Sequence, residues 1–261
     1  MVMKRRDFLA SCAAAVAAAQ FGCAGKAPVL GLIFPTSTRG FEEGVTMYGE
    51  QLTFVEAKLG LKQMTPEGYD SVIPLIPAAA EKLAAKGADA IELLGTSLTF
   101  YKGEAFNQKL RETVTKASGL PATTMSNGVI EGLKAVRAKR VAAATAYNDV
   151  VNDRLRAFLI EHGFEPVVIT GMGIEETVAA EKVPEKVIRE FVARVRKSAP
   201  EADSMLVSCG GFRTLELIAP LEALTGVPVI SSMPHGLWAG AVLVGMNGAV
   251  PGYGKLLSRE K

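Results

Sequence analysis

The chain has 261 residues, with 29 lysines and arginines against 27 aspartates and glutamates, so its formal net charge is +2. Apolar residues make up 49% of it, enough for one large or two modest domains with a hydrophobic core. The near balance of charge argues against a nucleic-acid partner. Three cysteines cannot form a disulfide framework, and two histidines without a cysteine–histidine cluster argue against a zinc site, so no metal is predicted.

Residues 1–27 have the pattern of an export leader rather than of a folded domain. The basic start Lys4-Arg5-Arg6 precedes an apolar run from Phe8 to Ala19, whose 12 residues are too few to span a bilayer. The order Arg5-Arg6-Asp7-Phe8-Leu9 resembles the bacterial twin-arginine signal. We therefore expect the precursor to use the twin-arginine export machinery and the protein to work in the periplasm or otherwise outside the cytoplasm.

Two features compete as the end of this leader. Ala17-Ala18-Ala19 is a cleavage site of the A-x-A type, whereas Cys23 after Gly22 is placed like the cysteine of a lipoprotein signal. Gln20 stands where the lipoprotein signal has an aliphatic residue, so a lipid anchor at Cys23 is the weaker alternative.

From Pro28 onward, short apolar runs alternate with helical patterns, which is typical of parallel α/β structure. The pattern predicts strands over Val29–Phe34, Ala90–Leu94, Ala122–Met125, Arg140–Ala144, Glu165–Ile169, Ser204–Ser208 and Val227–Ser231. The less regular segment Gln51–Leu59 is expected to supply one more strand of the first half. Helices are expected over Ile76–Lys86, Glu104–Ala117, Asp149–His162 and Glu185–Lys197.

Three segments of the first half recur in the same order in the second half. Val29–Thr36 matches Arg140–Tyr147, Ala88–Ser97 matches Ala202–Gly211, and Gly119–Met125 matches Gly226–Ser232. Matches in one order indicate an internal repeat. We therefore predict two pseudo-symmetric, Rossmann-like lobes with parallel sheets and a cleft between them. The first lobe is expected over residues 28–135, completed by 232–261, and the second over residues 136–231.

The candidate site lies in the segments that follow four of these strands, because open parallel sheets bind ligands at the carboxyl ends of their strands. The segments are Pro35-Thr36-Ser37, Gly95-Thr96-Ser97, Tyr147-Asn148 and Cys209-Gly210-Gly211. The repeat makes Gly95 and Cys209 counterparts on opposite walls of the cleft.

Cys209 is the one cysteine outside the leader, and it stands at a strand end before two glycines. Glycines let backbone N–H groups approach a ligand closely, and a helix expected to begin near Thr214 would favour an anion at its N-terminus. The residue is either a reactive thiol or a buried structural one. A thiol with an ordinary pKa of about 8.5 is mostly protonated near neutral pH, which suits it to protonating a carbanion or an enolate.

Three hydroxyls accompany this thiol, those of Thr96, Ser97 and Tyr147. With the N–H groups near Cys209 and Gly210, they would form a neutral cradle for a carboxylate or an enolate. Alternatively Thr96 and Ser97 cap the helix that follows them, and both roles can hold together. The set favours proton transfer next to a carboxylate, without a cofactor.

The two histidines leave one further alternative open. A cysteine nucleophile needs a base such as histidine, and His235 follows the last predicted strand, from where it could approach the cleft. A Cys–His hydrolase therefore stays open. His162 is expected at a solvated helix end.

The two-lobed pattern resembles the aspartate/glutamate racemase superfamily, whose racemases use one cysteine from each lobe. Within it, the chain resembles the arylmalonate decarboxylase family over residues 28–261. The segments that carry the resemblance are Thr65-Pro66-Glu67-Gly68-Tyr69-Asp70, Gly95-Thr96-Ser97-Leu98-Thr99-Phe100-Tyr101, Ala144-Thr145-Ala146-Tyr147, Ser208-Cys209-Gly210-Gly211 and Pro251-Gly252-Tyr253-Gly254. Racemases and the related maleate isomerases need a second cysteine in the first lobe, where this chain has Gly95.

The resemblance implies a carbon–carbon lyase that decarboxylates 2-substituted (aryl)malonates, small dicarboxylate substrates. One carboxylate would lie in the cradle, and the other in an apolar pocket for which Pro35, Leu98 and Ile174 are candidates. Cys209 would protonate one face of the enediolate.

Two positions depart from the family pattern. Thr36 and Thr177 stand where the family has apolar residues, which makes this pocket more polar.

Two other functions stay open on the sequence. One is a racemase or a cis–trans isomerase of small carboxylates in the same superfamily, which would need a second acid or base near Gly95. The other is a non-enzymatic exported carboxylate-binding protein, which would leave Cys209 without a role.

Overall fold

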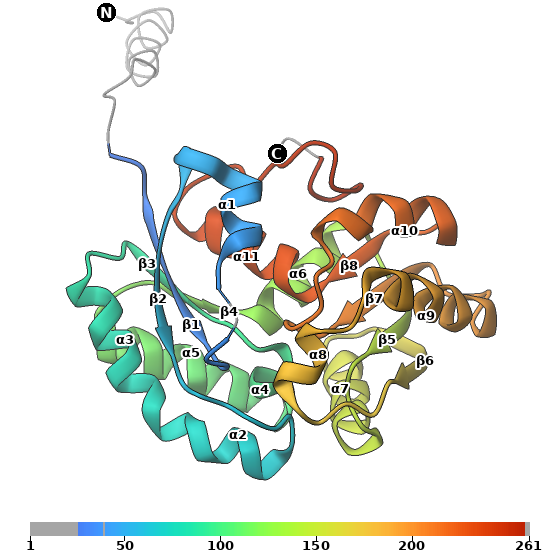
Figure 1. The fold of residues 1–261 in the computed structure, drawn as a ribbon, viewed down its shortest axis with the longest axis horizontal. Coiled ribbons are helices and arrows are strands. Elements are labelled where there is room, and N and C mark those ends of the chain that lie inside the picture. The colour runs from blue at the N-terminus through green and yellow to red at the C-terminus, as the bar shows by residue number, and fades with distance from the viewer. Residues whose placement is uncertain (1–25, 39, 259–261) are drawn as a thin grey trace, which may run out of the picture.

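The computed structural model describes residues 26–38 and 40–258, and in this part of the chain eight strands form two parallel sheets (Figure 1). The predicted leader, apart from Lys26 and Ala27, lies outside the described residues, as do its candidate ends at Ala17–Ala19 and at Cys23. None of the described helices is long and apolar enough to cross a membrane.

The first sheet contains β1 (Val29–Phe34), β2 (Thr53–Lys58), β3 (Ala90–Leu93) and β4 (Ala122–Thr124), in the order β2-β1-β3-β4. Both β1 and β3 are buried along their whole length, because helices cover both faces of the sheet. The helices of this half are α1 (Glu42–Tyr48), α2 (Pro66–Val72), α3 (Ile76–Ala85), α4 (Thr96–Phe100), α5 (Glu104–Ser118) and α6 (Met125–Ala135), with short 3₁₀ turns at Gly49–Gln51 and Ile73–Leu75.

The second sheet contains β5 (Arg140–Thr145), β6 (Glu165–Gly171), β7 (Ser204–Ser208) and β8 (Val229–Ser231), in the order β6-β5-β7-β8. The order repeats that of the first sheet, strand for strand. Its helices are α7 (Asp149–Glu161), α8 (Thr177–Glu181), α9 (Glu185–Ser198), α10 (Ile218–Thr225) and α11 (Ser232–Leu243), with a 3₁₀ turn at Leu215–Leu217. The predicted fold class, two pseudo-symmetric parallel α/β lobes, is confirmed.

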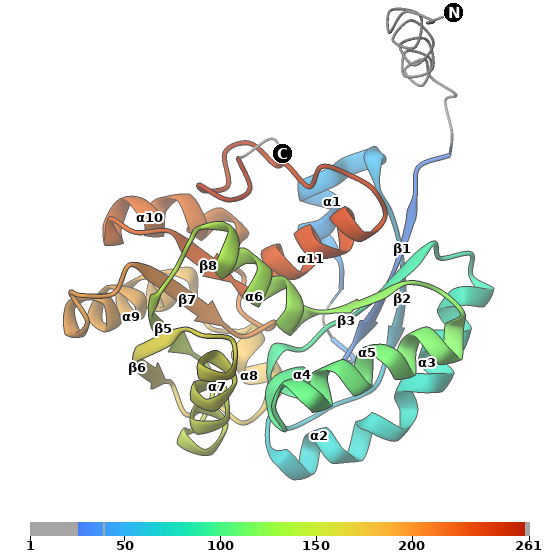
Figure 2. The same cartoon turned by 180° about the vertical axis from the view of Figure 1, so that it is seen from behind.

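Two helices join the sheets in the middle of the molecule. α6 follows the last strand of the first sheet and α11 the last strand of the second, and the two pack against each other (Figures 1 and 2). They approach closely at small residues, since a Cβ at Gly128 would lie 2.6 Å from the carbonyl oxygen of His235. α11 contacts strands of both sheets, so these contacts do not assign it to one lobe alone. The lobe boundaries at residues 135, 136 and 231 therefore stay predictions.

The predicted strands lie within two residues of the observed ones, and the helix expected near Thr214 is present. It begins with the 3₁₀ turn at Leu215–Leu217, whose N-cap is Thr214, and continues into α10 from Ile218. The N–H groups of Thr214 and Leu215 both donate to Oε1 of Glu43 at 3.1 Å. A carboxylate of the first half therefore takes the anion position that the sequence had suggested for a ligand.

Candidate active site

A cavity lies at the carboxyl ends of both sheets. The segment after each of the eight strands contributes to its lining. The lining residues are Phe34, Pro35 and Thr36 at the end of β1; Leu61 and Met64 after β2; Leu94 to Leu98 after β3; Met125 after β4; Tyr147 after β5; Thr177, Ala180 and Glu181 after β6; Cys209, Gly210 and Gly211 after β7; and Met233 after β8. Seven of the eight predicted site residues are among them, and Ile174 is not.

Ile174, which was predicted to line the apolar pocket, is not among the residues that line the cavity. Its backbone N–H donates to the carbonyl of Ala146 at 2.8 Å, so the chain is still fastened to the end of β5 at this point. The apolar lining on this side comes instead from Ala180 on α8 and from Leu61 and Met64 after β2.

The threonine at 177 adds less polarity to the cavity than its type suggests. Its hydroxyl lies 3.2 Å from the carbonyl oxygens of both Leu61 and Lys62, to which it donates. The backbone N–H of Thr177 also donates to Lys62, and that of Met64 donates to Glu175. These bonds tie the loop after β2 to the loop after β6 across the two halves, and they satisfy the Thr177 hydroxyl.

The thiol of Cys209 lies at the end of β7, a strand buried at every position, and the residue is only 3% exposed. The N–H of Gly211 points to its sulfur at 3.3 Å, and the sulfur of Met64 lies 4.0 Å away. This thiol is therefore held at the cavity wall and shielded from bulk water.

The buried hydroxyls of Thr96, Ser97 and Tyr147 lie in the lining of the same cavity as this thiol. Thr96 donates to the hydroxyl of Ser232 at 2.7 Å, and the hydroxyls of Tyr147 and Ser208 lie 3.1 Å apart. Burial, and after it the proximity of Cys209, raises the pKa of Tyr147 well above its usual value, while the hydroxyls of Ser208, Ser97 and Thr96 lower it. The predicted cradle residues therefore lie together as neutral, buried donors.

The alternative that Thr96 and Ser97 only cap a helix is wrong. Both residues lie inside α4, whose N-cap is Gly95, and no side chain caps it. They are the first two residues of this helix, and both line the cavity.

Tyr69 is a buried hydroxyl that the strand-end argument missed. Its side chain is fully buried, and its hydroxyl has no hydrogen-bond partner among the residues that the structure describes. Burial raises its pKa well above the usual value, the nearby hydroxyl of Ser97 lowers it, and Tyr147 and Cys209 raise it further. An unsatisfied donor next to the thiol and the cradle is a group that a bound anion would satisfy.

Gly95 forms the wall on the side of the first sheet, in a conformation that only glycine adopts readily. Its φ angle is 96°, and a Cβ there would lie 2.9 Å from Cγ of Pro35. A side chain that could act as a second acid or base at this position would need both strain and displacement of Pro35. The racemase alternative therefore finds no support on this wall.

His235 does not serve the cavity, which removes the basis for a Cys–His hydrolase. It is fully buried on α11 and is not one of the lining residues. Its Nδ1 lies 2.9 Å from both the backbone nitrogen and the backbone oxygen of Ser231, and burial lowers its pKa to about 4.

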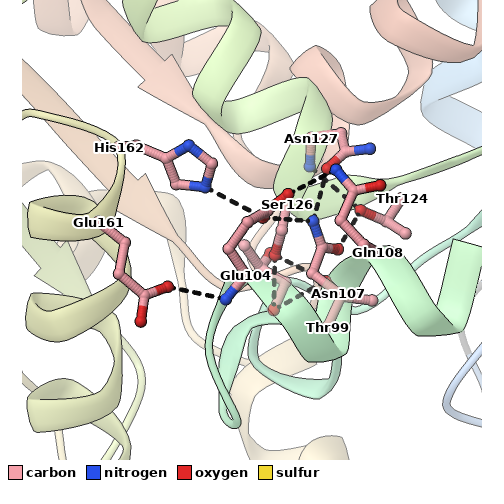
Figure 3. A network of polar contacts seen from close by, with 10 residues as sticks. Thr99, Glu104, Asn107, Gln108, Thr124, Ser126, Asn127, Glu161 and His162 are labelled. Carbon is pink, nitrogen blue, oxygen red and sulfur yellow. Dashed lines mark hydrogen bonds and ion pairs between the residues drawn. The ribbon is translucent and has the colours of Figure 1, made fainter.

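The sequence predicted His162 at a solvated helix end. Its ring instead takes part in a contact between the two halves (Figure 3). Its Nε2 lies 3.1 Å from a carboxylate oxygen of Glu104, the first residue of α5. The preceding Glu161 accepts the backbone N–H of Glu104 at 2.8 Å. A carboxylate from the second half thus caps a helix of the first, where the helix dipole favours negative charge.

A second group of hydrogen bonds in Figure 3 connects α4 to α6. The hydroxyls of Thr99 and Ser126 lie 2.6 Å apart, and Ser126 donates to the carbonyl of Thr96 at 3.0 Å. The helix that carries the cradle hydroxyls is thereby fixed to α6, so these hydroxyls are held in place before a ligand arrives.

Metal ligands do not gather at this site. Within residues 26–38 and 40–258, no three histidine, cysteine, aspartate or glutamate side chains lie close enough together to hold a metal ion.

The comparisons with known proteins agree with this geometry. The family model described as arylmalonate decarboxylase matches residues 30–257. The chain belongs to the arylmalonate decarboxylase family. It is 42% identical over 235 residues to the arylmalonate decarboxylase of Bordetella bronchiseptica, a match that covers 89% of this chain and 98% of that protein. As a member of this family, the chain is an enzyme, a carbon–carbon lyase of the carboxy-lyase type.

Solved structures show the same fold. A liganded arylmalonate decarboxylase with one glycine-to-cysteine and one cysteine-to-serine substitution superimposes with a TM-score of 0.85 at 40% identity, covering 88% of this chain and 99% of that chain. The maleate isomerase Iso from Pseudomonas putida S16 superimposes with a TM-score of 0.83 at 22% identity, covering 90% of this chain and 99% of the isomerase. The resemblance to the isomerase shows the fold alone.

Proposed function

We propose that this enzyme decarboxylates 2-substituted malonates, with arylmalonates as the substrate class, by a mechanism that needs no cofactor. The observation that carries the proposal is the pairing of one buried thiol, Cys209, with a cluster of neutral hydroxyl donors, opposite a wall formed by Gly95.

One carboxylate of the substrate binds in the cradle. Thr96, Ser97 and Tyr147 offer hydroxyls there, and the backbone N–H groups near Cys209 and Gly210 complete the set. Neutral donors bind a carboxylate and strengthen their hold as negative charge builds up on it during the reaction. The cradle therefore stabilises the enediolate more than the starting malonate.

The other carboxylate lies against the apolar part of the lining, which includes Pro35, Leu98, Leu61 and Met64. An ionised carboxylate is poorly solvated in such surroundings, whereas CO2 is neutral and loses little there. The bond between this carboxylate and the α-carbon breaks, CO2 leaves, and the electron pair of that bond passes into the enediolate held by the cradle.

Cys209 then donates its proton to the α-carbon, and the thiolate that forms takes up a proton from water to complete the cycle. The wall at Gly95 offers no acid, so the proton arrives from one face. A single proton donor fits a decarboxylase, whereas a racemase removes a proton on one face and delivers one on the other.

The release of CO2 from phenylmalonate by the purified protein tests this proposal. We expect turnover with incorporation of one solvent deuterium in deuterium oxide. Exchange of the α-proton of a monocarboxylate without CO2 release would favour a racemase instead, and saturable binding of phenylmalonate without turnover would favour a binding protein.

Tyr69→Phe tests whether the orphaned hydroxyl belongs to the cradle. We expect kcat/KM for phenylmalonate to fall by roughly a hundredfold, because one preorganised donor to the enediolate is lost. Tyr101→Phe is a matched control, since its ring packs 5.0 Å from that of Tyr69 while its hydroxyl donates to Asp70. Equal kcat/KM values for the two variants would remove Tyr69 from the cradle.

We also propose that the precursor is exported through the twin-arginine machinery and cut after Ala19. Replacing Arg5 and Arg6 together by lysine keeps the positive charge but removes the paired guanidinium groups that the signal carries. The unaltered precursor should then be found outside the cytoplasm and the double variant inside it. Mass spectrometry of the exported protein separates cleavage after Ala19 from a lipid-modified Cys23, and a wild-type chain retained in the cytoplasm would refute export.

A further inference from the structure

Glu181 is the one charged residue among the described residues that line the cavity. It ends α8, and it is half-buried. Its Oε1 accepts hydrogen bonds from the hydroxyls of Thr36 at 3.2 Å and Thr38 at 2.8 Å, both in the segment after β1. A carboxylate of the second half is thus fixed against a wall of the first half through one of its two oxygens.

The position of this carboxylate is set by more than its own bonds. Thr177 and Ala180, on the same short helix, are buried, and Thr177 is bonded to the backbone after β2. The backbone of Glu181 lies beside Gly211, two residues after Cys209, since a Cβ at Gly211 would come within 3.4 Å of the Glu181 nitrogen. The carboxylate therefore lies in a fixed place at the rim of the same cavity as the thiol.

A negative charge at this place acts differently on the three groups, or arms, that the α-carbon of a substituted malonate carries. Two arms are carboxylates, which a neighbouring carboxylate repels, and the third is the substituent on the α-carbon. The repulsion directs the carboxylates to the cradle and the apolar lining, so the substituent is the arm that lies toward Glu181. An apolar ring alone would leave this charged group without a partner on that side.

We propose that Glu181, positioned by Thr36 and Thr38, is the specificity-determining residue of this enzyme and selects 2-arylmalonates whose ring carries a cationic group. An ammonium on the ring would pair with the half-buried carboxylate at the rim of the cavity, where salt screens such a pair less than at an open surface. This inference rests on the proposed decarboxylation, and it names the substrate class for that same site.

The test compares two substrates that differ in charge and hardly in size: phenylmalonates bearing either an aminomethyl or an ethyl group, each at the meta and the para position of the ring. For the wild-type protein we expect kcat/KM to favour the aminomethyl compound at least tenfold at one of the two positions. In Glu181→Gln, which keeps the shape and removes the charge, we expect that ratio to fall at least tenfold. In Glu181→Lys, we expect the ratio to fall below one.

Glu176→Gln is the matched control, because it removes an equal charge from the same loop at an exposed residue that does not line the cavity. Its ratio should equal that of the wild type. A wild-type preference for the ethyl compound, or a ratio that is the same in Glu181→Gln as in the wild type, would overturn the inference while leaving the decarboxylase proposal intact. Absence of CO2 release from all four compounds and from phenylmalonate would overturn the proposed function itself.

Discussion

Cys209→Ser is expected to bind a substrate analogue nearly as well as the wild type while its kcat for phenylmalonate falls by roughly 10²- to 10⁴-fold. Loss of a positioned general acid typically costs this much, and a serine hydroxyl is a far weaker acid than a thiol. The substitution should be tolerated sterically, because the side chain is smaller and the N–H of Gly211 that now points to the sulfur can point to the hydroxyl instead. Initial rates of CO2 release measure the loss, and calorimetric titration with a non-reactive phosphonate analogue measures the binding.

The same comparison with Cys209→Ala separates the acid from its surroundings. We expect Cys209→Ala and Cys209→Ser to lose activity to the same degree, with thermal unfolding midpoints close to that of the wild type. Turnover by Cys209→Ser within a few-fold of the wild type would show that another group protonates the intermediate. Loss of analogue binding in both variants would show that Cys209 serves binding rather than proton transfer.

Glu92→Met is expected to stabilise the folded protein by on the order of 3 kcal/mol at pH 8, and by much less at pH 5. Glu92 lies on the central strand β3 and is fully buried, and neither carboxylate oxygen has a partner within residues 26–38 and 40–258. The space that holds it exists because Gly236 and Gly240 of α11 lack side chains: a Cβ there would lie 2.6 Å and 2.7 Å from its oxygens.

The pH dependence follows from the proton that this carboxyl keeps. Burial, with a further contribution from Glu131, raises the pKa of folded Glu92 to about 8, against 4.5 for an ordinary glutamate. Between these two pH values the unfolded chain has released a proton that the folded chain still binds. The free energy of unfolding therefore falls as the pH rises through this window and levels off above about 8.

Chemical unfolding at pH 5 and at pH 8.5 measures the effect. Glu92→Gln, which keeps the shape, should show the same trend as Glu92→Met, and Glu81→Gln on the exposed face of α3 should leave the free energy of unfolding nearly unchanged at both pH values. A gain from Glu92→Met that is equal at the two pH values would show that packing, and not ionisation, is responsible.

The sequence was most informative where one local rule governs the structure. Strands buried on both faces give continuous apolar runs, so β1, β3, β5 and β7 could be placed within a residue, and the residues that follow them could be assigned to one cleft. Repetition of three segments in one order indicated the second lobe. Hence Cys209, Thr96 and Tyr147 could be predicted to lie in the same cleft, although they are far apart along the chain.

Where long-range packing decides, the sequence was silent or misleading. Ile174 follows a strand in the sequence, yet its backbone remains bonded to Ala146, and a helix that begins three residues further on provides the lining. Tyr69 lies in α2, away from any strand end, and only the folding of that helix over the cleft brings its hydroxyl to the thiol. The N–H groups at the start of the helix near Thr214 are not left for a ligand, because Glu43, a distant residue, accepts two of them.

The surroundings of two carboxylates, Glu92 and Glu181, could not be predicted from the sequence either. Glu92 interrupts an apolar run without any sign that both its oxygens are enclosed, and Glu181 ends an ordinary amphipathic stretch. Their surroundings come from elements at least 30 residues away, such as α11 for Glu92 and the segment after β1 for Glu181.

The convergence of eight strand ends on one cavity has a consequence for how substrate preference can change during evolution. Nearly every lining residue belongs to a loop or to the first turn of a helix, and the strands that hold these segments apart contribute almost nothing to the surface that a ligand touches. Exchanges in the loops after β1, β2 and β6 can therefore alter which substrates are accepted, while the sheets and the thiol at the end of β7 are inherited unchanged. A laboratory library restricted to Thr36, Leu61, Met64, Thr177, Ala180 and Glu181 would explore that variation without touching the scaffold.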